Sequence, residues 1–263
     1  MDEKTKGPFD PEGPDEEEPF LKVTERGDPS QEPFFNLPGG ITVILVVLLI
    51  IYSGTGWFLS DEISEWIMSE FGFSPLRYVY SFADQDFAWL WTPVTYSLLH
   101  GSIEHLGFNA LWLAAFGTPV WRRIGAFRFA IFWVVTAVAS AFFHAALNWG
   151  DSSLLIGASG VISGLMGACC RFVFGPGRMG LMLRDTGELA PRFSILAALQ
   201  QKTVIVFIVM FVFANAIIAF GVTLAGDPGA PIAWDAHLGG FLVGFLGFGL
   251  FDPVRGKALE TQS

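Results

Sequence analysis

Two apolar segments of this chain begin with a nucleophile and a base. Ser159 lies in a Gly-Ala-Ser-Gly motif that starts at Gly157 and ends at Gly160, and His237 lies in an Ala-His-Leu-Gly-Gly motif that ends at Gly240. Ionisable side chains within apolar segments are costly and usually functional. A serine hydroxyl is a weak nucleophile until a neighbouring base takes its proton, and imidazole is such a base. The pair therefore predicts a hydrolase site.

A third polar element runs from His100 to Asn109 and opens another apolar segment. His105 and Asn109 are four residues apart, so they share one face of a helix and could both donate hydrogen bonds toward one point. We expect Asn109 and the backbone N–H of Ser159, either with or without His105, to stabilise an oxyanion. His100 is expected to line this site or to pack behind it.

No carboxylate completes a catalytic triad in this pattern. Asp235 is two residues from His237 and would face a different side of a helix. We therefore predict a catalytic dyad of Ser159 and His237, with no metal and no cofactor. His144 has no comparable polar partners in the sequence, and we interpret it as a packed or interfacial histidine.

The composition is typical of a protein embedded in a membrane. Hydrophobic residues make up 52% of the chain and aromatic residues 15%, with 25 acidic against 15 basic side chains. Eleven of the acidic residues fall within the first forty positions, so the apolar remainder carries little net charge. Because no basic surface is indicated, we expect no nucleic-acid partner.

Six apolar stretches are each close to the roughly 20 helical residues that cross a bilayer core. They cover residues 41–59, 95–120, 127–147, 157–174, 203–224 and 234–251. We therefore predict an all-α polytopic membrane protein, a bundle of six transmembrane helices. The adjacent Cys169 and Cys170 lie within the fourth stretch and are interpreted as small buried hydrophobic residues.

Lysine and arginine fall mostly on one side of these spans. Of the 15 basic residues, only Arg77 lies in a connection on the opposite side from the rest. Basic residues favour the cytoplasmic side of a membrane. We therefore expect both termini in the cytoplasm, and the polar starts of the second, fourth and sixth spans toward the outer face.

The chain divides into a membrane domain and two tails. Acids and prolines predict a disordered acidic cytoplasmic tail over residues 1–38, without a secretory signal. Residues 39–252 form the membrane domain, in which 61–91 is an outer interfacial loop with an amphipathic helix and 175–202 a cytoplasmic loop. Residues 253–263 are expected to be a cytoplasmic C-terminal tail.

Glycines give two of the predicted helices faces that can approach closely. Gly160 and Gly164 share a face of the fourth span, and Gly240 and Gly244 share a face of the sixth. Small residues allow the backbones of two membrane helices to come together. If these faces pack against each other, the serine and the histidine come within hydrogen-bonding reach.

Taken together, the three polar elements resemble the rhomboid family of intramembrane serine proteases. The resemblance covers about residues 41–251. It rests on His-x4-His-x3-Asn starting at His100, Gly-x-Ser-Gly starting at Gly157, and Ala-His-x2-Gly-x3-Gly starting at Ala236. It implies a six-helix rhomboid-like bundle and intramembrane proteolysis.

The resemblance also implies the role of each site residue. Ser159 would be the nucleophile, His237 the base, and Asn109 with His105 the oxyanion donors. The partners would be transmembrane protein substrates in the lipid bilayer, which enter sideways past the fifth helix and are cut within or near their spanning segment. The implied location is a bacterial inner membrane.

Three positions differ from patterns that members of this family carry. Thr92 stands where some members have an arginine after a tryptophan, and Trp121 stands where a glutamate is often found between two glycines. Ser163 stands where well-known members have an aromatic residue that stacks on the catalytic histidine.

Two other functions would use parts of the same pattern. A catalytically inactive relative would bind membrane clients, but it would have no use for an intact Ser159 and His237. A small transporter or channel would carry ionisable groups through the full depth of the bilayer, and the inner halves of these spans have almost none.

Overall fold

A computed structural model of the chain describes residues 37–174, 191–220 and 232–254. Within these ranges the chain forms helices and loops with one isolated antiparallel bridge, so the all-α prediction is confirmed. Among the described residues, three helical stretches are long and apolar enough to cross a membrane, namely Gly39–Phe58, Ile103–Leu147 and Lys202–Ala219.

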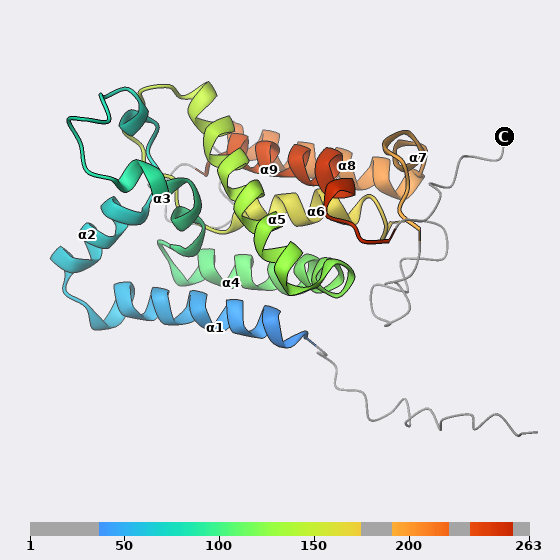
Figure 1. Cartoon of the computed structure of the whole chain (residues 1–263), viewed down its shortest axis with the longest axis horizontal. Coiled ribbons are helices and arrows are strands. Elements are labelled where there is room, and N and C mark those ends of the chain that lie inside the picture. The colour runs from blue at the N-terminus through green and yellow to red at the C-terminus, as the bar shows by residue number, and fades with distance from the viewer. Residues whose placement is uncertain (1–36, 175–190, 221–231, 255–263) are drawn as a thin grey trace, which may run out of the picture. The chain divides into compact units, whose positions relative to one another are not determined.

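Figure 1 shows the order of the helices along the chain. They are α1 (Gly39–Ser53), α2 (Asp61–Phe71), α3 (Ala88–Thr95), α4 (Ile103–Trp112), α5 (Thr118–Leu147), α6 (Ser159–Cys169), α7 (Ile195–Leu199), α8 (Lys202–Ala219) and α9 (Trp234–Gly247). Turns of π-helix extend α1 over Gly54–Phe58 and α4 over Leu113–Gly117, and a 3-10 turn, Phe248–Leu250, extends α9.

The second predicted span begins later than expected. Residues 96–102 form a 3-10 turn and a loop, and α4 starts only at Ile103. Ser102 sets this start, because its hydroxyl accepts a hydrogen bond from the His105 backbone N–H at 3.2 Å and so caps the helix.

The second and third predicted spans are nearly continuous with each other. The helical path from Ile103 to Leu147 is broken at Gly125, where φ is 73°. Glycine adopts this left-handed conformation without the steric cost that a side chain would add. The count of six spans stays a prediction.

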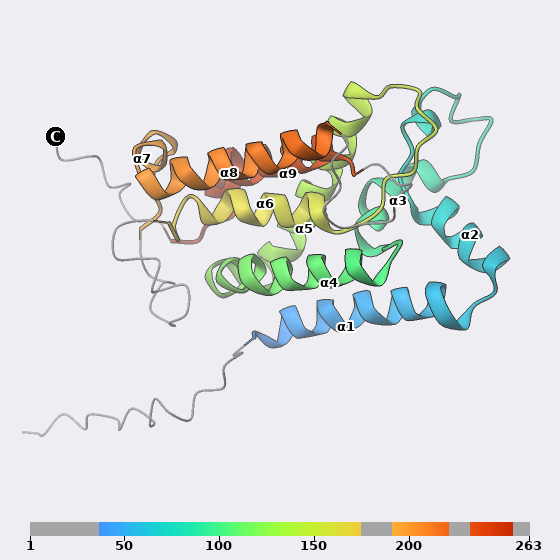
Figure 2. The same cartoon turned by 180° about the vertical axis from the view of Figure 1, so that it is seen from behind.

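Helix α6 is enclosed by other helices. All of its residues except Ser159 and Met166 are buried. In Figures 1 and 2 it runs between α4 and α8, and it packs against α5 and α9. By contrast, α1 and α8 expose apolar side chains along their length, as expected for helices in contact with lipid.

Glycines bring the backbones of α6 and α9 into contact. A Cβ atom on Gly240 would overlap the carbonyl oxygen of Gly160, and a Cβ atom on Gly244 would overlap that of Gly164. Larger residues at these positions would push the two helices apart. The two glycine faces thus meet along the axis of the bundle.

The loop that leads into α6 is held by the segment before α4. Phe73 and Leu155 exchange two backbone hydrogen bonds, at 3.1 Å and 2.7 Å. The backbone N–H of Gly157 donates to the carbonyl of Tyr96 at 2.9 Å, and the Tyr96 hydroxyl donates to the carbonyl of Ala137 at 3.0 Å. The start of α6 is therefore fixed by contacts from two distant parts of the chain.

An amphipathic helix, α2, lies within the segment 61–91 as expected. Ser60 caps it by accepting a hydrogen bond from the Ile63 backbone N–H at 3.4 Å. Ile63 and Trp66 are 46% and 59% exposed, an arrangement typical of side chains that enter interfacial lipid. Trp91 Nε1 donates to the carbonyl of Glu70 at 3.0 Å and ties α3 to α2.

At the opposite end of α6 from Ser159, buried arginines join the helices. Arg123 of α5 donates to both carboxylate oxygens of Asp252, at 3.0 Å and 2.9 Å, and both side chains are fully buried. Arg171, just after α6, donates to the carbonyls of Phe193 and Phe245 at 3.0 Å and 2.6 Å. Such multiple hydrogen bonds are what make buried charges tolerable.

Several sequence-based predictions fall largely outside the described residues. These are the N-terminal tail 1–38, most of the loop 175–202 and most of the C-terminal tail 253–263, which stay predictions. Cys169 and Cys170 are both free and buried, in agreement with their interpretation as packed hydrophobic residues.

We expect Gly240→Val and Gly244→Val to destabilise the bundle. Inserting side-chain atoms into a filled contact costs roughly 1–3 kcal/mol, so the Tm of each variant in detergent should fall by about 2 °C or more. Gly247→Val is the matched control on α9, because a Cβ atom there meets only the flexible Val243 side chain, at 4.0 Å. Equal Tm values for all three variants would contradict the glycine contact.

Candidate active site

Ser159 is the first residue of α6 and follows a loop with an unusual backbone. Gly157 has φ of 111°, a conformation that residues with a side chain rarely adopt. As the first residue of a helix, Ser159 has a backbone N–H with no acceptor within the helix. Its side chain is only partly buried. The serine therefore presents a hydroxyl together with a backbone N–H that has no acceptor within its own helix.

His237 lies in the first turn of α9 and contacts the serine. Its Nε2 lies 2.9 Å from Ser159 Oγ. The glycine contact sets this distance, because Gly160 adjoins the serine and Gly240 follows the histidine by nearly one turn. The side chains can meet because the backbones touch beside them.

The other ring nitrogen of His237 is held by a residue that the sequence analysis missed. His237 Nδ1 lies 2.8 Å from Oδ1 of Asn215 on α8, and Asn215 Nδ2 donates to the carbonyl of Phe211 at 2.8 Å. A signal was present, because Asn215 is the only polar side chain in α8 after Thr203. A polar side chain in an otherwise apolar membrane helix is costly and usually functional, so Asn215 is a functional candidate for the same reason as His237.

Asp235 faces away from the serine, as its spacing in the sequence indicates. Its carboxylate lies 2.8 Å from His144 Nδ1 and 2.5 Å from Asn148 Nδ2, and it accepts the Ala236 backbone N–H at 2.8 Å. His144, interpreted from the sequence as a packed or interfacial histidine without comparable polar partners, is buried here and does have such partners, Asp235 and Asn148. The cluster joins the end of α5 to the start of α9, the helix that carries His237.

Helix α4 brings His105 and Asn109 to the loop before the serine. A Cβ atom on Gly157 would lie 2.5 Å from His105 Nε2 and 3.6 Å from Asn109 Nδ2, so both side chains border this glycine. Asn109 is buried, and its Nδ2 has no hydrogen-bond partner among the described residues. A buried amide donor without a partner is costly. Asn109 therefore holds an unused donor beside the start of α6.

The other sequence-predicted positions lie around these residues. His100 is buried and packs its ring edge-to-face on His105, with 5.0 Å between ring centroids, so it reaches the site through that histidine. Ser163, which replaces an aromatic residue of the resembled family, is buried one turn after the serine on α6.

Two further departures from the family pattern occupy packing positions. The Trp121 ring fills the space beside Gly40 of α1 and packs on Phe129, with 5.0 Å between ring centroids. Thr92 of α3 is fully buried. Neither residue contacts Ser159 or His237 by any hydrogen bond within the described part of the chain.

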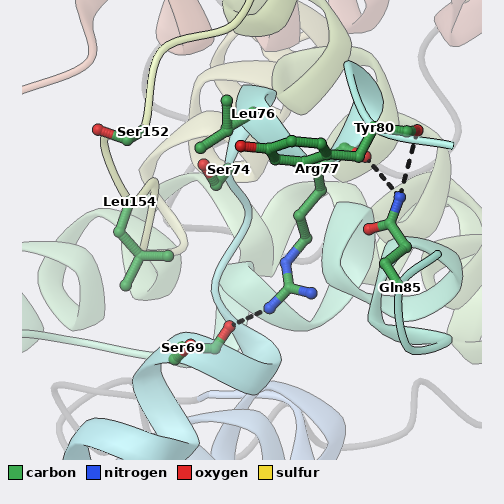
Figure 3. A pocket seen from close by; sticks show the side chains of 8 residues that line it. All are labelled: Ser69, Ser74, Leu76, Arg77, Tyr80, Gln85, Ser152 and Leu154. Carbon is green, nitrogen blue, oxygen red and sulfur yellow. Dashed lines mark hydrogen bonds between the residues drawn. The ribbon is translucent and has the colours of Figure 1, made fainter. Parts of the chain in front are cut away.

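A separate cavity of about 340 Å³ lies beside the segment between α2 and α3 (Figure 3). Its lining consists of Ser69, Ser74, Leu76, Arg77, Tyr80, Gln85, Ser152 and Leu154. The Arg77 guanidinium donates to the Ser69 carbonyl at 2.8 Å and to the Asp86 carboxylate at 3.1 Å. The lining includes none of the candidate site residues Ser159, His237, Asn109 and His105, so this cavity is not part of the candidate site.

Comparison with known proteins matches residues 88–252 to a family model described as the Rhomboid domain. Rhomboid protease GlpG from Serratia proteamaculans (strain 568) is 30% identical over 161 residues, which are 60% of this chain and 46% of that protein. Rhomboid protease GlpG from Yersinia pseudotuberculosis serotype I (strain IP32953) is 27% identical over 158 residues, again 60% of this chain and 46% of that protein.

The chain spans about half the length of the curated relatives it matches. The matched region, 88–252, covers more than half of the chain and contains Ser159, His237, Asn215, Asn109 and His105. Apolar helices of spanning length lie within and around it. This chain is therefore an integral membrane protein that belongs to the rhomboid family.

Proposed function

We propose that this protein is a serine endopeptidase that cleaves single-span membrane proteins within or near their transmembrane segment. Ser159 is the nucleophile and His237 the general base. The observation that carries the proposal is the 2.9 Å distance between Ser159 Oγ and His237 Nε2. The relatives are named rhomboid proteases, and this name supports the same chemistry.

In the first step, Ser159 Oγ attacks the scissile carbonyl carbon while His237 Nε2 takes the hydroxyl proton. The resulting tetrahedral intermediate collapses when the C–N bond breaks, and the imidazolium gives its proton to the leaving amine. Water then attacks the acyl-enzyme with the same histidine as base. Collapse of the second tetrahedral intermediate releases the new carboxyl end and restores the serine hydroxyl.

The oxyanion of both intermediates needs hydrogen-bond donors at the start of α6. Two of them are the Ser159 backbone N–H, which has no acceptor within α6, and Asn109 Nδ2, which has no partner among the described residues. His105, which borders Gly157 beside Asn109, supplies a third. Donors already held in place cost little reorganisation when charge develops, which is why they lower the barrier.

The substrate reaches the site from the side of α8. Only Val204 and Asn215 are buried on this helix, so most of its surface is free for an arriving substrate helix to contact. A substrate helix must unwind before its peptide bond reaches the serine, and unpaired amides in lipid are costly. Polar groups at the site offset part of this cost, so substrates with helix-breaking residues near the cleavage site are favoured.

We further propose that the site faces the outer side of a bacterial inner membrane, with both termini in the cytoplasm. The excess of lysine and arginine in the connections on the other side supports this orientation. Contacts among the starts of α4, α6 and α9 support a site near one end of the bundle, the part that water for deacylation must reach.

We expect Ser159→Ala and His237→Ala each to abolish cleavage of a model single-span substrate by the purified protein. The two side chains act as one unit, so either loss should lower turnover by roughly a million-fold, the scale known for other serine proteases. Cleavage is measured by gel with substrate in proteoliposomes, and a fluorophosphonate should label the wild type but not Ser159→Ala.

The matched control is Ser163→Ala, one turn along the same helix, which should cleave like the wild type. Substantial cleavage by purified Ser159→Ala would rule out this serine as the nucleophile. A wild-type protein that binds substrate, takes no label and never cleaves it would instead favour an inactive client-binding protein.

Removal of the oxyanion donor should slow the reaction without preventing it. We expect Asn109→Ala and Asn109→Asp each to lower kcat by about a hundred-fold or more, because neither can donate to the oxyanion. Fluorophosphonate labelling of Ser159 should still occur, at a lower rate. If kcat of both variants equals that of the wild type, Asn109 has only a packing role.

A further inference from the structure

We propose that Asn215 is a positioning residue that fixes the tautomer and the orientation of His237. The proposal rests on the function proposed above. It adds a third residue to the pair and assigns it to α8, a helix that carries neither the nucleophile nor the base.

Hydrogen-bond chemistry determines which way the Asn215 amide points. Its Nδ2 donates to the carbonyl of Phe211, four residues earlier on α8, at 2.8 Å. A carbonyl oxygen can only accept, so the nitrogen of the amide must lie on that side. The Oδ1 atom is then the group that faces His237 Nδ1 at 2.8 Å.

The orientation of Asn215 in turn determines the tautomer of His237. Because Oδ1 can only accept, Nδ1 must carry the ring proton. A neutral imidazole has one N–H, so Nε2 keeps a lone pair, and this lone pair faces Ser159 Oγ at 2.9 Å. The ring is thus held in the one neutral form that can take the serine proton.

The other candidate for this role is engaged elsewhere. Asp235, the nearest carboxylate in sequence, is bound to His144, Asn148 and the Ala236 backbone N–H. Asn215 is buried, so water does not easily replace its contact with the ring. Within the described residues, the contact between α8 and His237 is therefore the one that orients the base.

The test compares two substitutions of Asn215 in the full-length protein in proteoliposomes. Asn215→Leu removes the acceptor at similar volume, and we expect kcat to fall roughly ten- to a hundred-fold with little change in KM, since a buried ring N–H loses its partner. Asn215→Asp keeps an acceptor oxygen at the same position, and we expect kcat to stay within about threefold of the wild type.

Two further readouts separate positioning from general loosening of α8. The rate of fluorophosphonate labelling should fall in Asn215→Leu in parallel with kcat, because the reagent reports activation of the serine without entry of a substrate helix. Phe213→Leu, an exposed change on the same helix, should leave both rates and the Tm unchanged. Asn215→Ala serves as a second acceptor-free variant if Asn215→Leu proves unstable.

The outcomes distinguish this proposal from the proposed function. Wild-type kcat in the acceptor-free variants, or an equal fall in Asn215→Leu and Asn215→Asp, would overturn the positioning role while Ser159-dependent cleavage by the wild type remained. Absence of Ser159-dependent cleavage in the wild type would overturn both. A loss in Asn215→Leu that Asn215→Asp largely avoids supports the proposal.

Discussion

The close contact of the α6 and α9 backbones is the constraint on which the candidate site depends. Gly240 and Gly244 rest against the carbonyl oxygens of Gly160 and Gly164, where no Cβ atom fits. In lipid the hydrophobic effect does not press helices together, so such fitting surfaces must supply the attraction. The distance from hydroxyl to imidazole follows from this contact. At the far end of α6, Arg171 donates to the carbonyl of Phe245 on α9 and so joins the same two helices a second time.

The proposed chemistry also requires a particular tautomer of His237, the one whose Nε2 carries a lone pair toward Ser159. A hydroxyl and an imidazole at hydrogen-bonding distance do not by themselves define which ring nitrogen is the base. In this chain the amide of Asn215 on α8 faces His237 Nδ1, and its own direction is set by a carbonyl of the same helix. Because only two residues of α8 are buried, the proposed orientation of the His237 ring depends on how a loosely packed helix sits against α9.

The sequence predicted the helical class and the contact faces well, because both depend on local periodicity. Glycines four residues apart share one face of a helix, whatever that helix packs against. Ser159 and His237 could be recognised because each lies near the start of an apolar stretch. The late start of α4 could not be predicted, because it depends on the cap at Ser102. Asn215 was missed because its partner lies on another helix, and one side chain carries no periodic pattern.

The burial of α6 has a consequence for how the surrounding lipid acts on this protein. A helix whose apolar length does not match the bilayer responds by tilting, and only helices that meet lipid experience this mismatch. Nearly all of α6 is covered by protein, whereas α8 and α9 both carry exposed apolar side chains. Because the glycine contact ties α9 to α6, a thinner or thicker membrane acts mainly on α8 and on the contact between Asn215 and His237, while Ser159 and His237 stay together. Bilayer thickness thus becomes a variable that acts on the residue proposed to orient His237, and leaves the distance between Ser159 and His237 unchanged.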